Sequence, residues 1–320
     1  MTQRISLKMN RAGLKQAAAN VTLVANAFIW YLLAFNGIKH LTQDYQNLTQ
    51  DHQLLLIIGI NTGAIALSGL IGTLLVDRIK NRRLFLYLWL FVGILLSMVP
   101  LCLNTLNLID LSFISLVFGL YFGIGMPATM GYHSGLIGIG GRAKIGGITF
   151  FIIGATFAFT GFIDIDSILI LSIILAAVRI VGLAVFHIAQ SNETQERPPK
   201  EQERAKYRRI IPNKSFILYF VPWLMIALVN FLTVPIQEQV YPAYPSPGNF
   251  NQLTALENVV IAIAAVFSGF IADKMGRKRL SIVGFVMLGI GYAVIGLSYT
   301  TIPNVTANLT EMLYPCIIFT

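Results

Sequence analysis

Residues 269–280 read GFIADKMGRKRL, and residues 73–84 read TLLVDRIKNRRL. Each stretch follows a long apolar segment, carries one aspartate and a cluster of basic residues, and precedes another apolar segment. Asp77 and Asp273 stand 196 residues apart, and the same offset superimposes several neighbouring apolar segments without a gap. Self-similarity at one fixed offset predicts a chain built from two related halves.

The apolar segments around these stretches have the length of membrane spans. The chain is 56% hydrophobic and 12% charged, which is about half the charged fraction of a soluble domain. An apolar block of about 20 residues crosses roughly 30 Å of hydrocarbon as an α-helix. We therefore expect an all-α polytopic membrane protein. The predicted spans are 16–37, 53–76, 84–104, 109–132, 145–163, 167–189, 215–235, 254–273, 280–299 and a tenth that begins near residue 306.

Basic residues predict the orientation of these spans. With the N-terminus inside, the inner segments hold 21 of the 23 Lys and Arg residues, and only Lys39 and Arg179 lie elsewhere. The positive-inside rule therefore places the N-terminus and the central linker in the cytoplasm. We expect an integral protein of the cell membrane. The net charge of +9 follows from this distribution and predicts no nucleic-acid partner.

The repeat also predicts the domain organisation. Residues 1–189 form a first half of six spans, and residues 190–214 form a polar, proline-containing linker. We interpret the linker as a connector, with a regulatory or lipid-contacting role as the alternative. Residues 215–320 hold spans 7 to 9 and part of span 10. Spans 4 to 6, shifted by the offset, end about 65 residues beyond Thr320, so we expect this second half to be incomplete.

The repeated stretches carry a recognisable loop motif of the form G-x-x-x-D-R/K-x-G-R/K-R/K. The second copy fits it with Gly269, Asp273, Lys274, Gly276, Arg277 and Lys278. The first copy keeps Asp77, Arg78 and Arg82 but has Thr73, Lys80 and Asn81 at other motif positions. Together with the six-plus-six plan, these loops resemble those of the major facilitator superfamily of secondary transporters.

The resemblance implies transport by alternating access, in which the two halves rock about a site near the membrane midplane. It also implies that the loop clusters latch a cytoplasmic gate; the residues concerned are Asp77, Arg78, Arg82, Gly269, Asp273, Gly276, Arg277 and Lys278. The residue types suit this role, because glycine permits close helix approach and tight turns. The Asp273 carboxylate can pair with Arg277 or Lys278, or with the N-terminus of an adjacent helix. Topology determination alone is the alternative.

The resemblance places spans 1, 4, 7 and 10 around the central cavity. Aromatic and hydrogen-bonding residues recur there at helical spacing: Asn26, Trp30, Tyr121, Gly125, Thr129, Trp223 and Asn230. Such stripes suit a small polar or amphipathic organic solute. The same residue types also join helices or fill space between them, so both interpretations stay open.

Two ionisable residues lie within predicted spans, where a charge is costly and indicates a functional site. Glu257 stands about 24 Å along its helix from the cytoplasmic end. It could titrate as a proton-coupling group or contact water at the outer face. Arg179 lies about 18 Å into span 6. It could contact an anionic substrate, pair with a residue of the remaining spans, or bind backbone carbonyls.

Several function classes lack their sequence motifs. Cys102 and Cys316 have no metal or redox spacing, and neither a phosphate-binding loop nor a nucleophile–base motif occurs. We therefore expect no metal, no cofactor and no enzymatic activity. The expected partners are a small-molecule substrate, a coupling proton or ion, and the lipid bilayer, with the chain acting as a monomer. The alternative function is a transporter-like sensor or scaffold, or a membrane-embedded enzyme.

Overall fold

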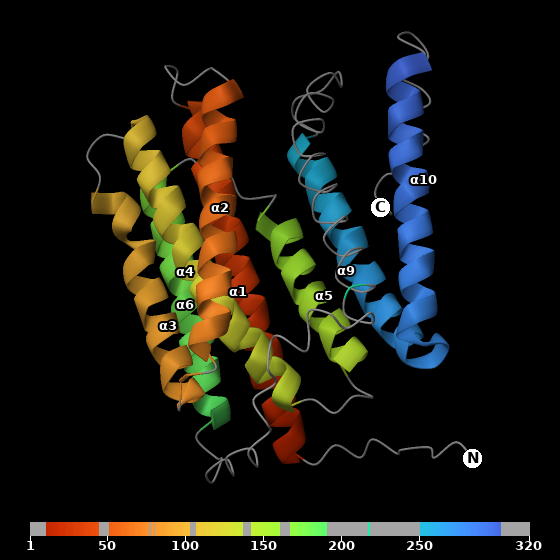
Figure 1. The fold of residues 1–320 in the computed structure, drawn as a ribbon, viewed down its shortest axis with the longest axis horizontal. Coiled ribbons are helices and arrows are strands. Elements are labelled where there is room, and N and C mark those ends of the chain that lie inside the picture. The colour runs from red at the N-terminus through yellow and green to blue at the C-terminus, as the bar shows by residue number, and fades with distance from the viewer. Residues whose placement is uncertain are drawn as a thin grey trace.

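The computed structural model describes residues 11–44, 51–76, 78–79, 81–102, 107–136, 142–160, 167–190, 217 and 250–301. These residues form eight α-helices and one 3-10 helix and contain no strand, which confirms the all-helical prediction for this part of the chain (Figure 1). The helices are α1 (Arg11–Asp44), α2 (Asp51–Val76), α3 (Arg82–Ser97), η1 (Val99–Cys102), α4 (Leu108–Leu136), α5 (Arg142–Thr160), α6 (Ile168–Gln190), α9 (Phe250–Met275) and α10 (Arg277–Thr301). The predicted span 215–235 and the start of a tenth span lie outside the described residues.

Six of the described helices are long and apolar enough to cross a membrane: Ala17–Ile38, Leu56–Val76, Arg82–Cys102, Leu108–His133, Ile168–Ile188 and Asn258–Met275. The apolar part of α5, Ala143–Phe159, is shorter. Many large apolar side chains of these helices are exposed, such as Leu67 and Leu70 on α2 and Phe91 on α3. A soluble protein rarely exposes so much apolar surface, so the helices are those of an integral membrane protein.

The predicted span 84–104 corresponds to the apolar segment Arg82–Cys102, in which α3 ends at Ser97 and the last turn is the 3-10 helix η1. Pro100 has no N–H to donate and its ring crowds the preceding turn, which ends the α-helical hydrogen-bond ladder. At the other end, the Asn81 side chain caps α3 by accepting a hydrogen bond of 3.0 Å from the Leu84 N–H.

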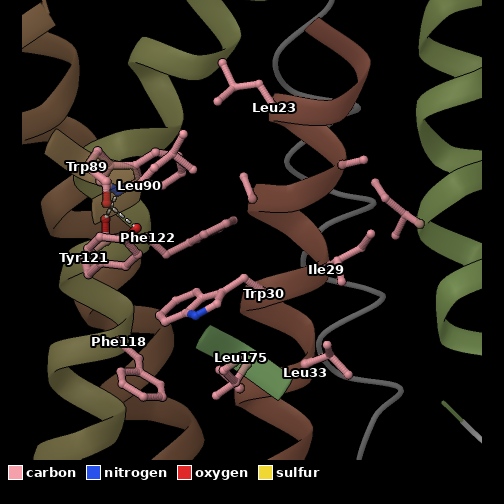
Figure 2. Packing of buried hydrophobic residues seen from close by; sticks show 14 of the residues in the cluster. Leu23, Ile29, Trp30, Leu33, Trp89, Leu90, Phe118, Tyr121, Phe122 and Leu175 are labelled. Atoms are coloured by element: carbon pink, nitrogen blue, oxygen red, sulfur yellow. Dashed lines mark hydrogen bonds between the residues drawn. The ribbon is translucent and has the colours of Figure 1, made fainter. Parts of the chain in front are cut away.

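The helices pack as one group around α1. This helix contacts α4, α5 and α6, while α2 packs along α4 and α3 along α6. On the other side, α5 packs along α9, and α9 contacts α10, so α5 stands between the α1 group and the pair α9–α10 (Figure 1). The buried core lies mainly between α1, α3, α4 and α6, where Trp30, Trp89, Phe118 and Tyr121 fill the interior (Figure 2).

The two motif-bearing connections lie at the same end of the helix group. The α2–α3 connection and the α9–α10 connection both close the lower end in Figure 1, and α5 begins at that end. Gly276 forms the turn between α9 and α10 with φ of +89°, a left-handed conformation that glycine adopts without strain. The basic residues Arg78, Arg82, Lys274 and Lys278 thus belong to connections or helix ends at this same end of the helix group.

Candidate functional site

Arg179 is the buried charge at the centre of the first six helices. It belongs to α6 and has 0% exposed surface, as does Trp30 of α1 beside it. The neighbouring residue Val178 uses its carbonyl oxygen to accept a hydrogen bond from the Asn26 side-chain amide. Since that amide is held by its nitrogen, its oxygen points to the guanidinium, and Nη1 of Arg179 donates to Asn26 Oδ1 at 2.9 Å.

Three aromatic rings surround the Arg179 guanidinium. Its central carbon lies 4.7 Å from the ring centre of Trp30, 4.6 Å from that of Trp89 and 5.3 Å from that of Tyr121. These distances fit cation–π attraction, which is stronger at a desolvated site. Figure 2 shows Trp30 extending from α1 toward Tyr121 on α4, and Trp89 stacked over Tyr121.

The polar atoms of these rings all bond to other groups, so the rings present only their faces to Arg179. Trp30 Nε1 donates to Ser97 Oγ at 2.8 Å. Trp89 Nε1 donates to the Tyr121 carbonyl at 3.0 Å, and the Tyr121 hydroxyl donates to the Trp89 carbonyl at 2.6 Å. Among the described residues, Nε and Nη2 of Arg179 therefore have no hydrogen-bond partner.

Two glycines, which have no side chain, provide the space that Arg179, Asn26 and Tyr121 occupy. A Cβ at Gly93 of α3 would lie 2.2 Å from the Tyr121 hydroxyl and 2.8 Å from Arg179 Nε. A Cβ at Gly182, one turn after Arg179, would lie 2.4 Å from the Asn26 side chain. Contacts this short do not occur between real atoms, so a side chain at either position would displace groups of this cluster.

A second cluster joins α5 to α9 at the motif-bearing end. Lys144 Nζ lies 3.9 Å from Asp273 Oδ2, with side chains that are 35% and 14% exposed respectively. Lys144 also lies over the ring of Phe270, 5.5 Å from its centre. Among the described residues, Asp273 Oδ2 accepts no hydrogen bond, so its contact with Lys144 is an ion pair alone. The sequence suggested Arg277, Lys278 or a helix N-terminus as partners of Asp273, and it did not identify Lys144.

Beside this ion pair, α5 and α9 approach too closely for any side chain. A Cβ at Gly147 would lie 2.5 Å from the Ala265 carbonyl oxygen, and one at Gly269 would lie 2.7 Å from the Ala143 carbonyl oxygen. Further along, a Cβ at Gly154 would lie 2.9 Å from Asn258 O and Ala262 Cβ. We refer to these contacts, from Ala143 to Gly154 on α5, as the α5–α9 seam. The motif residue Gly269 thus serves close helix approach.

The other predicted motif residues lie apart from this contact. Arg78, Arg82 and Lys278 are exposed, and none of them forms an ion pair with a carboxylate in the described part of the chain. Asp77 lies outside the described residues, as does the side chain of Arg277. The gating roles of these five residues stay predictions.

The predicted cavity residues divide into three sets. Asn26, Trp30 and Tyr121 meet around Arg179, as described above. On α4, a Cβ at Gly125 would lie 1.9 Å from the Trp89 ring, and the Thr129 hydroxyl donates to the Gly125 carbonyl at 3.0 Å within the same helix. Trp223 and Asn230 lie outside the described residues, as does the side chain of Glu257, so their roles stay predictions.

A further polar contact that the sequence did not indicate joins α1, α2 and α4. The Tyr31 hydroxyl donates to Asn61 Oδ1 at 2.9 Å, and Asn61 Nδ2 donates to the Ser115 carbonyl at 2.8 Å. Such interhelical bonds hold membrane helices together. Because every group in this contact has a partner, we interpret it as structural.

Comparison with known proteins adds one distant relative. No protein-family model matches the chain. A segment of 105 residues is 26% identical to the low affinity inorganic phosphate transporter 4 of Medicago truncatula and covers 29% of this chain. The match spans only 20% of that transporter's length. By its name that relative is a transporter of inorganic phosphate, and its likeness to this chain is limited to the matched segment.

Proposed function

We propose that this chain is a secondary transporter of the major facilitator type, which moves a small solute by alternating access between two related halves. In this proposal α1 to α6 belong to the first half, and α9 and α10 belong to the second. The basic ends of the helices face the cytoplasm, as the positive-inside distribution of Lys and Arg predicts.

The α5–α9 seam is the observation that carries this proposal, because it joins the two proposed halves. Along the seam the helices touch through glycine, alanine and backbone atoms. Contacts of this kind depend on close packing of small residues. Among the described residues, the charged contact of the seam is Lys144–Asp273, at its end.

This arrangement suits a gate. A partly exposed ion pair contributes little free energy, typically below about 1 kcal/mol. Thermal motion can therefore break and remake it, while the seam guides the two helices back into the same register. The repeated motif then has a use in the second half: Gly269 permits the close approach, and Asp273 supplies the acidic member of the latch.

The experiment that tests this function measures solute exchange in proteoliposomes. Phosphate is the first solute to test, because the distant relative carries it in its name. The proposal predicts exchange of external labelled solute against internal unlabelled solute, and it predicts that Asp273→Asn reduces this exchange without loss of insertion. A membrane sensor or scaffold would show ligand binding without exchange of any solute in a broad panel.

A further inference from the structure

The guanidinium of Arg179 is a positive charge whose neutralising partner is not supplied by the helices around it. An arginine side chain has five N–H donors and carries its charge at all relevant pH values. Its described hydrogen bond goes to Asn26, which is neutral, and its other neighbours are aromatic faces. In the described part of the chain no carboxylate forms an ion pair with Arg179.

Burial without a counter-charge is unfavourable. The guanidinium is fully buried, and a charge at this depth of a membrane protein normally pairs with another charge or marks a ligand path. The aromatic rings lower the free energy of the cation without neutralising it. The site therefore favours binding of an anion.

The two free donors have the geometry of an anion-binding fork. Nη1 is committed to Asn26, and the unpartnered atoms are Nε and Nη2. In arginine these two nitrogens lie on one edge of the guanidinium, with parallel N–H bonds that match two oxygens of a carboxylate or phosphate. Asn26 and the rings fix the plane of the guanidinium, so the edge is presented in one orientation.

Position 93 borders this edge. A Cβ there would lie 2.8 Å from Nε, so any residue other than glycine would cover part of the fork. Gly93 thus adds no side chain beside Nε, while Trp89 and Tyr121 pack on the face of the same buried group.

We propose that the Nε–Nη2 edge of Arg179 binds a small oxyanion, a phosphate, sulfate or carboxylate group, as the charged part of the transported solute. This assignment rests on the transport function proposed above and names its substrate class. Asn26, Trp30, Trp89 and Tyr121 position the guanidinium, and Arg179 makes the contact with the anion.

Binding of labelled inorganic phosphate to the purified full chain in lipid nanodiscs tests this assignment. Wild type should bind phosphate saturably, and sulfate should compete while chloride at equal ionic strength should not. Arg179→Met should abolish saturable binding. Arg179→Lys keeps the charge but lacks the fork, and should weaken binding about thirtyfold or more. Gly93→Ala should weaken phosphate binding although the positive charge of Arg179 is retained.

Arg279→Met serves as the matched control, since it removes one exposed positive charge from the first turn of α10 and should leave binding unchanged. If Arg179→Met does not fold, Arg179→Lys and the sulfate competition on wild type decide the question. The assignment is wrong if wild type binds neither phosphate, sulfate nor acetate saturably, or if the Arg179 variants bind with the wild-type Kd.

Transport and binding are separable in this design. Saturable, Arg179-dependent binding without flux in proteoliposomes would contradict the transport function and leave the anion site standing. If Arg179→Met transports a solute at the wild-type rate, the transport function stands and the anion site is contradicted, since transport then proceeds without the proposed anion contact.

Discussion

Nη1 of Arg179 donates a hydrogen bond of 2.9 Å to Oδ1 of Asn26, which joins α6 to α1 between residues 153 positions apart in the chain. The amide nitrogen of Asn26 is in turn bound to the Val178 carbonyl. One asparagine thus binds a side chain and a backbone group on successive residues of the same helix. This double contact fixes the direction in which the Arg179 charge points.

Replacement of Asn26 should reveal how much stability this contact provides. Asn26→Leu has similar volume but leaves Nη1 without a partner, and we expect a loss of about 2 kcal/mol, typical of a hydrogen bond to a buried charged group. Asn26→Asp supplies a carboxylate to Arg179 but loses the amide donor to the Val178 carbonyl, so it should be more stable than Asn26→Leu. Thermal unfolding followed by tryptophan fluorescence measures both, and a fully stable Asn26→Leu would contradict this role.

Asn26→Asp should also remove the response to anions. The new carboxylate neutralises Arg179 from within the protein, so added phosphate should no longer raise the unfolding temperature. In wild type the same addition should raise it, because a ligand that binds only the folded state stabilises that state. An equal increase in both proteins would show that phosphate binds elsewhere.

Adjacent glycines on α5 offer a matched test of the α5–α9 seam. A Cβ at Gly147 would lie 2.5 Å from the Ala265 carbonyl oxygen, whereas one at Gly146 meets nothing within 4 Å. Gly147→Ala should therefore destabilise the packed state by about 1–3 kcal/mol, the usual effect of overpacking, and reduce solute exchange. Gly146→Ala should leave exchange unchanged. Equal behaviour of the two variants would show that the helices do not pack as described.

The sequence located most helices but not most contacts. The length of the apolar segments, and the glycine and basic residues at their ends, identify α2, α4, α6 and α9 because these signals are local. Hydropathy did not show that α1 extends over Arg11–Asp44, beyond the predicted 16–37, because helical turns outside the hydrocarbon need no apolar residues. Pro100, by contrast, marks the end of α3 in the sequence, because proline cannot donate to the helical hydrogen-bond ladder.

In the candidate site, too, the sequence identifies some residues, while the contacts of others depend on the three-dimensional packing. Arg179 was identifiable because a charge in an apolar segment is unusual, and Asn26, Trp30 and Tyr121 were identifiable by type and spacing. Trp89 and Gly93 come from a helix that the resemblance places at the periphery, and their contact with Arg179 depends on how α3 packs in three dimensions. The same holds for Lys144, whose pairing with Asp273 joins segments far apart in the chain.

The Lys144–Asp273 pair should respond to charge reversal. Lys144→Asp or Asp273→Lys alone places two like charges where the wild-type pair lies 3.9 Å apart. Their repulsion should favour separation of α5 and α9 at this end of the seam. The double exchange should restore closure, with a coupling of less than about 1 kcal/mol because the pair is partly exposed. Cross-linking between cysteines introduced at the ends of α5 and α9 reports closure. Lack of rescue in the double variant would argue against a direct pair.

Replacement of Ser97 tests whether the hydrogen bond from Trp30 Nε1 holds the indole ring in place. Its hydroxyl accepts the Trp30 Nε1–H and donates to the Gly93 carbonyl at 2.7 Å. Ser97→Ala leaves a buried indole N–H unpaired and should cost about 1–3 kcal/mol. Combining it with Trp30→Phe, which removes the same N–H, should add little further loss. Fully additive losses would show that the two side chains act independently.

Counterflow of labelled phosphate into proteoliposomes that contain unlabelled phosphate tests the transport proposal most directly. The proposed mechanism predicts transient accumulation of label with wild type and its loss with Arg179→Met, while Gly146→Ala accumulates label normally. Absence of counterflow for phosphate, sulfate and small carboxylates, with protein that is folded and inserted, would contradict transport of an oxyanion by this chain.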